Sequence, residues 1–318
     1  MTIVLPTSLN IERAAKTLQE GGIVAFATET VYGLGCDTFN PEAIESVYRL
    51  KGRPRQNPTI AHVLEPSWVE QLTGDWNGQC DLLAKAFWPG PLTIVLPKKE
   101  KVPEAACGGR NTIAVRSPSH SVARQLLTSF GSSISAPSAN RSGYISPTTA
   151  KHVENEFGGK VFILDGGPCE EGIESTVLSL VTEPKILRPG TIPVQAIEEI
   201  IGPVTQTNRI TQTDSPGTTE QHYSPHTTVN LLPTDEINSI NDNTCAVLTL
   251  SGKPKEAKRC FQMPSKPKEY GALLYSVLRD ADSVGANQIA IEQPPQTADW
   301  HAIQDRLMRC AANTSETI

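Results

Sequence analysis

The stretch from residue 21 to residue 64 constrains the fold more than any other part of the chain. It opens with a glycine pair and the short apolar run Ile23–Phe26, and it closes with a second apolar run, Thr59–Leu64. Between the two runs, apolar residues recur at helical spacing from Pro41 onward, and proline is favoured at a first helical position. Two short buried strands on either side of a helix are typical of an α/β sheet.

The same alternation of predicted strands and helices continues to about residue 200. We expect helices at residues 10–20, 66–72, 81–87, 119–130 and 148–157, and strands at residues 92–96, 112–115, 132–136, 161–165, 175–180 and 185–188. Residues 202–228 then hold few large apolar side chains and many Thr, Gln and Pro, which indicates a linker. A second α/β pattern follows, with strands near residues 229–232, 245–250 and 288–291 and helices near residues 270–280 and 300–311. The sequence therefore predicts two α/β domains joined by a linker.

Bulk properties exclude several classes of protein. The chain of 318 residues has no apolar run long enough to span a membrane, and its N-terminus lacks the pattern of a secretory signal. Its seven scattered cysteines form no CxxC pair, which fits reduced thiols in the cytoplasm better than disulfides or a zinc site. A formal net charge of −6 argues against a generally basic nucleic-acid binder.

Polar residues gather where predicted strands end. A hydroxyl-rich turn spans residues 27–35, a second donor-rich loop spans residues 137–147, and Ser175-Thr176 and Arg188 lie at further strand edges. Such loops at strand ends favour a ligand site, although an ordinary turn remains an alternative for each.

The charged residues of this set also have structural explanations. Lys51, Arg53 and Arg55 fit either a phosphate-binding loop or a solvated helix C-terminus. His62, between two apolar neighbours in a predicted strand, fits a core position. Arg116, at the end of an apolar strand, needs an acidic partner or a ligand, and Asp165 and Glu174 are the candidate partners.

Common catalytic motifs are missing from the sequence. There is no GxxxxGK[ST], HExxH or GxSxG element, and the fragment Gly33-Leu34-Gly35 lacks the third glycine of a dinucleotide-binding fingerprint. No nucleophile–base pair or carboxylate dyad stands out. A set made of donors and cations suits a reaction in which the protein orients its substrates and stabilises phosphate charge.

Seven passages, in this order and spacing, closely resemble the Sua5/YrdC family of threonylcarbamoyl-AMP synthases. They are TETVYGLG (28–35), KGRPRQNP (51–58), WPGPLT (88–93), TIAVRSP (112–118), SAPSANRSG (135–143), GIESTV (172–177) and ILRPG (186–190). The match runs through nearly all of residues 8–200, and the later pieces Ser215-Pro216-Gly217 and His222-Tyr223-Ser224-Pro225 resemble the longer, two-domain Sua5 form.

The resemblance implies a fold and a reaction. It predicts a YrdC-like domain with a twisted mixed α/β sheet at residues 8–200, a linker or lid at residues 201–227, and a smaller Rossmann-like α/β Sua5 domain at residues 228–318. The implied reaction joins L-threonine, bicarbonate or CO2, and ATP into threonylcarbamoyl-AMP and pyrophosphate, with Mg2+ as the expected metal. The product would pass to a partner complex that modifies adenosine 37 of tRNA, so direct tRNA binding is not required of this chain.

Site residues carry over one by one from the resemblance. L-threonine is expected to lie among Thr30, His62, Arg116, Ala136 (through its backbone) and Thr176. ATP is expected to lie among Lys51, Arg53, Asn57, Thr112, Ser138, Asn140, Ser146, Arg188 and Tyr223, the last as part of a lid. No catalytic residue or metal ligand is assigned. One departure is that Thr218-Thr219-Glu220-Gln221 stands where family linkers often carry basic residues, which puts contact between the linker and ATP in doubt.

Two rival interpretations have other sequence features behind them. A non-enzymatic RNA-binding or ribosome-assembly module would use residues 51–55 as a phosphate clamp, against which the net charge and the lack of interleaved aromatic residues both argue. A nucleotide-dependent oxidoreductase would rest on the Gly33–Gly35 fragment alone.

Overall fold

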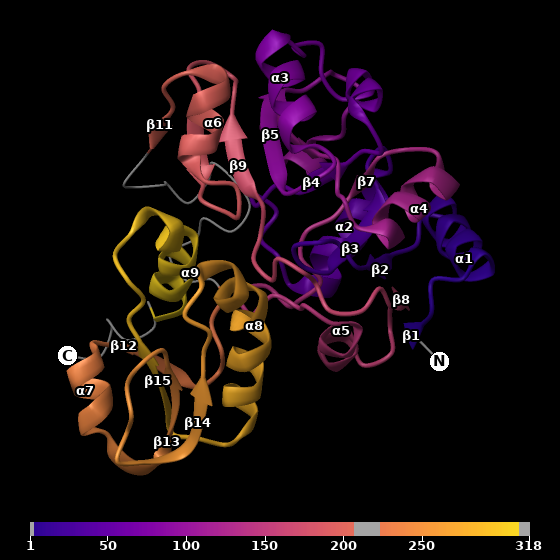
Figure 1. Cartoon of the computed structure of the whole chain (residues 1–318). Helices are drawn as coiled ribbons and strands as arrows, with labels where there is room; N and C mark the ends of the chain where they lie inside the picture. The colour runs from indigo at the N-terminus through magenta and orange to yellow at the C-terminus, as the bar shows by residue number, and fades with distance from the viewer. Residues whose placement is uncertain (1–2, 207–222, 312–318) are drawn as a thin grey trace. The chain divides into compact units, whose positions relative to one another are not determined.

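The computed structural model describes residues 3–206 and 223–311, which form two compact units (Figure 1). Unit 1 takes the described residues of Met1–Ser142, Pro147–Glu170 and Glu174–Thr218. Unit 2 takes those of Gly143–Ser146, Glu171–Ile173 and Thr219–Ile318. Most of the predicted linker, including Ser215–Gly217, Glu220 and His222, lies outside the described residues.

Unit 1 is built on a mixed sheet of eleven strands in the order β1-β8-β2-β3-β7-β4-β6-β5-β9-β10-β11. The sheet contains parallel pairs, such as β4 with β6, and antiparallel pairs, such as β5 with β6. The strands are β1 (Ile3–Val4), β2 (Val24–Phe26), β3 (Gly33–Asp37), β4 (Ile60–His62), β5 (Leu92–Pro97), β6 (Thr112–Arg116), β7 (Ile134–Ser135), β8 (Phe162–Leu164), β9 (Thr176–Ser179), β10 (Lys185–Arg188) and β11 (Thr205–Gln206).

Helices cover both faces of this sheet (Figure 1). The helices of unit 1 are α1 (Ser8–Gln19), α2 (Pro41–Lys51), α3 (Gly78–Phe87), α4 (Ser121–Phe130), α5 (Ala150–Phe157) and α6 (Val194–Ile201), with 3-10 turns η1 (Pro66–Gln71) and η2 (Glu104–Cys107). Successive side chains of a strand point to opposite faces, and β2 shows the result. Val24 and Phe26 pack with α1 and α4 in one core, whereas Ala25 packs with α2, α3 and α5 in the other.

The start and end of α2 follow directly from its sequence. Asn40 accepts hydrogen bonds from the backbone N–H groups of Glu42 and Ala43 at 3.0 Å each, and Pro41 occupies the first turn. Gly52 ends the helix in the left-handed conformation, at φ 63°. Lys51 is the last residue of α2, so the position at which the helix ends determines the direction of the Lys51 side chain.

Unit 2 contains a four-stranded, all-parallel sheet in the order β12-β15-β13-β14. Its elements are β12 (Thr228–Leu232), α7 (Thr234–Ser239), β13 (Asn241–Thr249), β14 (Glu256–Gln262), α8 (Pro267–Ser283), β15 (Gln288–Glu292), η3 (Ala298–Trp300) and α9 (His301–Ala311). Helix α8 runs beside β14 (Figure 1). The prediction of a mixed α/β sheet followed by a second, Rossmann-like α/β sheet is confirmed.

A buried carboxylate holds the strand ends of unit 2 together. Glu292, at the end of β15, is 2% exposed. One of its oxygens accepts from the N–H groups of Leu250, Ser251 and Gly252 at 2.6 to 2.9 Å, and the other accepts from the hydroxyls of Thr234 and Ser251 at 2.8 Å each. Burial alone would raise the pKa of Glu292, but these donors outweigh it and lower the pKa to about 2.

Several sequence-based expectations differ from the structure. Strands β1, β3, β11 and β14 and helices α6 and α7 were not predicted, and residues 66–71 form a 3-10 turn rather than a full helix. The Gly33–Gly35 fragment lies inside strand β3, and not in the loop between a strand and the first turn of a helix. A Cβ on Gly35 would come within 2.7 Å of both Ile134 and Phe26, so this glycine makes room for packing. The dinucleotide interpretation of this fragment is therefore wrong.

Among the residues that the structure describes, no helix is long and apolar enough to cross a membrane.

Candidate functional site

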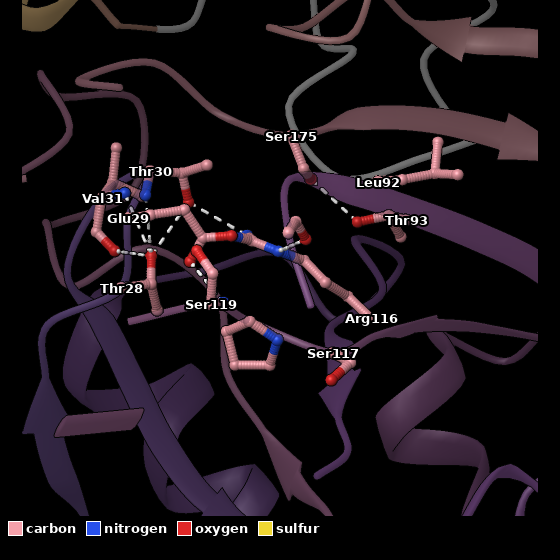
Figure 2. Close-up of polar contacts among 12 residues, drawn as sticks. Thr28, Glu29, Thr30, Val31, Leu92, Thr93, Arg116, Ser117, Ser119 and Ser175 are labelled. Atoms are coloured by element: carbon pink, nitrogen blue, oxygen red, sulfur yellow. Dashed lines mark hydrogen bonds and ion pairs between the residues drawn. The ribbon is translucent and has the colours of Figure 1, made fainter. Parts of the chain in front are cut away.

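A tight turn after β2 presents the side chains of Glu29 and Thr30 toward Arg116 of strand β6 (Figure 2). The hydroxyl of Thr28 accepts from the N–H groups of Thr30 and Val31 at 3.2 Å each and donates to the carbonyl oxygen of Val31 at 2.6 Å. These bonds close the turn locally, as Thr hydroxyls do in turns. As a result, Glu29 and Thr30 are buried and face the guanidinium of Arg116.

Arg116 is a buried charge of the site with three protein partners. It ends β6, is 3% exposed, and donates to the carbonyl oxygen of Gly90 at 3.2 Å and to the hydroxyl of Thr30 at 2.9 Å. Its Nη2 lies 2.7 Å from Oε1 of Glu29, whose other oxygen accepts from the N–H of Ser119 at 3.1 Å. Burial by itself raises the pKa of Glu29, but Arg116 and the N–H of Ser119 lower it overall, so the carboxylate stays ionised.

Glu29 was missed as a partner of Arg116. The sequence offered Asp165 and Glu174, yet Asp165 accepts a hydrogen bond from Tyr32 at 3.3 Å instead. The signal was present in TETVYGLG, because an acidic residue between two threonines at a strand end needs a partner as much as the arginine does.

Arg116 retains donors for a ligand. Of its five N–H groups, one faces Gly90, one faces Thr30 and one faces Glu29, which leaves two on the terminal nitrogens. Moreover, Nη2 of Arg116 and Oε1 of Glu29 form an ion pair but are not aligned for a hydrogen bond. Both atoms are therefore buried without a hydrogen-bond partner. A planar anion such as a carboxylate matches the two remaining donors.

His62 lies next to Arg116 across the sheet, since the two residues are paired in the parallel register of β4 and β6. Its Nδ1 lies 3.1 Å from the carbonyl oxygen of Ile60 and donates to it, and the ring meets that of Phe26 edge-on at 6.0 Å. Burial first, and then the charge of Arg116, lower the pKa of His62 to about 4. The imidazole is therefore neutral near pH 7, and the ring is both part of the core and part of the site.

The loop after β7 closes the same corner of unit 1 through its backbone. Ala136 donates from its N–H to the carbonyl oxygen of Ile60 at 2.9 Å, and Pro137 accepts from the N–H of Leu34 at 2.8 Å. Ser138 forms an isolated bridge with Gly33. Three strands, β3, β4 and β7, thus fix the path of the chain into the segment that holds Ser138 and Asn140.

Lys51 and Arg53 are buried cations directed at backbone carbonyl groups. Lys51, 2% exposed, donates from Nζ to the carbonyl oxygens of Ser138, at 2.6 Å, and Asn140. Arg53 donates to the carbonyl oxygens of Asn57 at 3.2 Å and Pro58 at 3.0 Å. Burial first, and then the neighbouring Arg53, lower the pKa of Lys51 well below its usual value. An anion beside these groups would offset the cost of burying two like charges.

These positions overturn two alternatives from the sequence. Lys51 and Arg53 do not form a solvated helix end, because both side chains are buried. Only Arg55 of the three is exposed, and it pairs with Glu45 at 2.8 Å. An RNA clamp at residues 51–55 needs its cations at the surface, so this interpretation is wrong as well.

A second group of hydroxyls lies where β5, β9 and β10 meet (Figure 2). Thr93 and Ser175 are joined through their hydroxyls at 2.8 Å, and Arg188 donates to the carbonyl oxygen of Ser175 at 3.0 Å. The hydroxyl of Thr176 bonds to both backbone groups of Ile192, at 2.8 and 3.0 Å. Ser175 was noted in the sequence as a polar residue at a strand edge, whereas Thr93 was not singled out.

Backbone crowding makes one glycine essential to this group. A Cβ on Gly190 would lie 2.2 Å from the backbone nitrogen of Thr176 and 2.7 Å from the carbonyl oxygen of Glu174. The turn after β10 can therefore pass over residues 174–176 only if it carries no side chain there.

The other candidates are spread more widely. Thr112 begins β6, at the end of the strand opposite to Arg116. Asn57 is buried, and its carbonyl oxygen accepts from the hydroxyl of Tyr48 at 2.6 Å. Ser146 and Tyr223 belong to unit 2.

No metal centre is built from protein side chains in the described part of the chain. No group of three or more His, Cys, Asp or Glu residues there could hold a metal ion. Apart from the paired carboxylate of Glu29 and the imidazole of His62, the site offers hydroxyls, backbone groups and cations, which suit anions.

This fold and donor set define an α/β protein with a strand-end site that suits small anionic ligands. A family model described as "Telomere recombination", for Sua5, YciO and YrdC proteins, matches residues 16–190. A second, described as "Threonylcarbamoyl-AMP synthase, C-terminal domain", matches residues 192–312. The chain therefore belongs to the Sua5/YciO/YrdC family, in the form that carries the Sua5 C-terminal domain.

Individual relatives match along nearly the whole chain. A protein of Pyrococcus abyssi named threonylcarbamoyl-AMP synthase is 36% identical over 333 residues, which cover 98% of each chain. One of the same name from Bacillus subtilis is 37% identical over 321 residues, which cover 95% of this chain and 92% of the other. The crystal structure of P. abyssi Sua5 complexed with L-threonine matches with a TM-score of 0.86 at 34% identity, covering 96% of this chain and 95% of that one.

Proposed function

We propose that this protein is a threonylcarbamoyl-AMP synthase, which makes threonylcarbamoyl-AMP and pyrophosphate from L-threonine, bicarbonate or CO2, and ATP. The observation that carries the proposal is the buried Arg116, which keeps two donors beyond its protein partners. A relative that is 34% identical is described in complex with L-threonine, whose carboxylate suits those donors.

In this mechanism Arg116 binds the carboxylate of threonine. Thr30, Ala136 and Thr176 surround the rest of the amino acid, Ala136 through its backbone. His62, with its pKa lowered to about 4, is a weak base near pH 7 and serves as a neutral wall of the pocket. The amino group of threonine attacks CO2, forms a carbamate and loses a proton.

The second step joins the carbamate to the nucleotide. A carbamate oxygen attacks the α-phosphorus of ATP, and the bond to pyrophosphate breaks as the new phosphorus–oxygen bond forms. The chain's contribution is to hold the two reactants in line and to stabilise negative charge on the phosphates. We assign this task to Lys51, Arg53, Asn57, Thr112, Ser138, Asn140, Ser146, Arg188 and Tyr223.

Mg2+ fits this scheme as a companion of the triphosphate. Because the described residues contain no cluster of acidic ligands, the ion would be held mainly by phosphate oxygens and water. Bound there, it would neutralise part of the charge that develops on the leaving pyrophosphate.

The wider role follows from the same reaction. We propose that the product passes to a complex that forms N6-threonylcarbamoyladenosine at position 37 of tRNA, and that this chain need not bind tRNA itself. All seven cysteines are free, which supports the cytoplasm as the compartment. We assign catalysis to residues 8–200, a closing role to residues 201–227, and support of the linker to residues 228–318.

Pyrophosphate release by the purified full-length protein tests the proposal. The expected result is release that requires L-threonine, bicarbonate and ATP together, with threonylcarbamoyl-AMP identified by mass spectrometry. Release that continues without either threonine or bicarbonate would show that the assignment is wrong.

A further inference from the structure

One face of helix α8 holds three segments that come from distant parts of the chain. The residues that form this face are Gly271, Tyr275, Arg279 and Asp282, spaced by four, four and three positions, which places them on one side of a helix. We call this set the α8 stripe. Its partners are Glu171–Ile173, Tyr223–Thr227 and Gly143–Ser146, and all of them belong to unit 2.

The first contact, at Gly271, is a close approach of two backbones. A Cβ on Gly172 would lie 2.4 Å from the carbonyl oxygen of Gly271, and Gly172 has a φ of 71°, which favours glycine. Beside it, Lys268 of α8 pairs with Glu171 at 3.5 Å. Residues 171–173 are therefore seated against the first turns of α8.

The second contact, at Tyr275, fixes the described end of the linker. The ring of Tyr223 stacks on that of Tyr275 with centroids 5.6 Å apart, and the guanidinium of Arg306 lies 5.2 Å from the centroid of Tyr223. Tyr223 has a φ of 62°, an uncommon conformation for a residue with a side chain. Such a backbone persists where the surroundings determine it, and here the two packed rings do so.

The third contact joins two of these segments through one carboxylate. Oδ2 of Asp282 accepts from the hydroxyl of Tyr144 at 2.8 Å and from the N–H of His226 at 3.2 Å, and Oδ1 accepts from the N–H of Thr227 at 2.8 Å. The rings of Tyr144 and His226 stack at 4.6 Å. Asp282 is thus shared between the segment 143–146 and the exit of the linker.

Arg279 completes this clamp from the preceding turn of α8. Its guanidinium lies 4.7 Å from the ring centroid of Tyr144, and its Nη2 donates to the carbonyl oxygen of Ile145. In addition, the N–H of Ser224 bonds to the carbonyl oxygen of Gly143 at 3.0 Å. The backbone next to Ser146 is therefore held on both sides.

Two of the three segments that the α8 stripe holds contain residues proposed to bind substrate. Ser146 is part of one segment and Tyr223 is part of another, and both are assigned to ATP under the proposed function. We propose that the α8 stripe is the means by which the tail domain serves catalysis, and that Asp282 and Arg279 are positioning residues for Ser146 and the linker exit. The inference rests on the proposed function and adds named residues to the role of the tail.

Asp282→Asn is the sharpest perturbation of this clamp. It keeps the volume of the side chain, but its amide group must place an NH2 where one carboxylate oxygen now accepts. Tyr144 can rotate its hydroxyl and accept, whereas the N–H of His226 or of Thr227 cannot, so one backbone donor loses its partner. Asp280→Asn is the matched control, because Asp280 is exposed on the same helix.

The steady-state test compares pyrophosphate release by the two variants. For Asp282→Asn we expect kcat/KM for ATP to fall about tenfold or more, as for the loss of a hydrogen bond to a charged acceptor, with an unchanged Kd for L-threonine. Asp280→Asn should match the wild type. Unchanged ATP kinetics in Asp282→Asn, or equal losses for ATP and threonine, would overturn the proposal.

Hydrogen exchange separates this inference from the proposed function, because it needs no turnover. Asp282→Asn should lose amide protection at residues 143–146 and 224–227 while α8 keeps its protection. If the wild type releases no pyrophosphate, the proposed function fails, yet the exchange result still decides whether Asp282 holds these segments. Unchanged protection there would refute the clamp itself.

Discussion

The buried ion pair between Arg116 and Glu29 permits a test that separates folding from ligand binding. In Arg116→Met the carboxylate of Glu29 remains buried with the N–H of Ser119 as its described donor. Breaking a buried pair on one side costs about 3–5 kcal/mol, so unit 1 should lose about that much stability. In Arg116→Met combined with Glu29→Gln, no charge is stranded, and most of the loss should be recovered.

Threonine binding should respond differently from stability. The two N–H groups left on Arg116 would form two charge-assisted hydrogen bonds with the substrate carboxylate, worth about 1.5–3 kcal/mol each. Both variants lack them, so the Kd for L-threonine should rise by at least about a hundredfold in each, although the double variant is nearly as stable as the wild type.

Urea unfolding and titration calorimetry measure the two quantities on the same samples. Arg55→Met is the control, because Arg55 forms an exposed pair with Glu45 at 2.8 Å, and losing it should cost less than about 1 kcal/mol. A double variant that folds and binds L-threonine with the wild-type Kd would refute the role of Arg116. A single variant as stable as the wild type would refute the energetic argument.

Two further predictions concern other buried contacts. Glu292→Gln should destabilise unit 2 by about 3 kcal/mol near pH 7, which is the free energy of a fall in pKa from 4.5 to about 2. Because the pKa of Glu292 is lower in the folded state, the loss of stability relative to the wild type is present in full above about pH 5 and shrinks as the pH falls toward 2. Urea unfolding at several pH values measures this loss. A loss that does not change with pH contradicts the reasoning. Gly190→Ala should lower pyrophosphate release by at least about tenfold, because its Cβ would collide with the backbone of Thr176. Gly78→Ala is the control and should leave release unchanged, because the space around Gly78 is open. Equal activity of the two variants would show that the turn can move aside.

Most of the architecture could be predicted from the sequence, because the patterns that indicate helices, strands and linkers are local. Apolar runs of strand length, helical periodicity after Asn40 and Pro41, and the change of composition after Gly202 predict two α/β domains without any knowledge of contacts. Elements with weaker local patterns were missed. Strand β14 has mostly exposed residues, and β1 has two residues and is defined by its pairing with β8.

The sequence by itself also supplied the types of residue in the site and the family resemblance. It did not decide which charges are buried or which atoms meet, because these depend on contacts between distant segments. Only the tertiary structure showed that Arg116 pairs with Glu29, 87 positions earlier in the numbering, and that Lys51 points at the carbonyl groups of Ser138 and Asn140. A cation at a helix end can be exposed to solvent or buried. Lys51 is buried because α2 packs against the loop after β7.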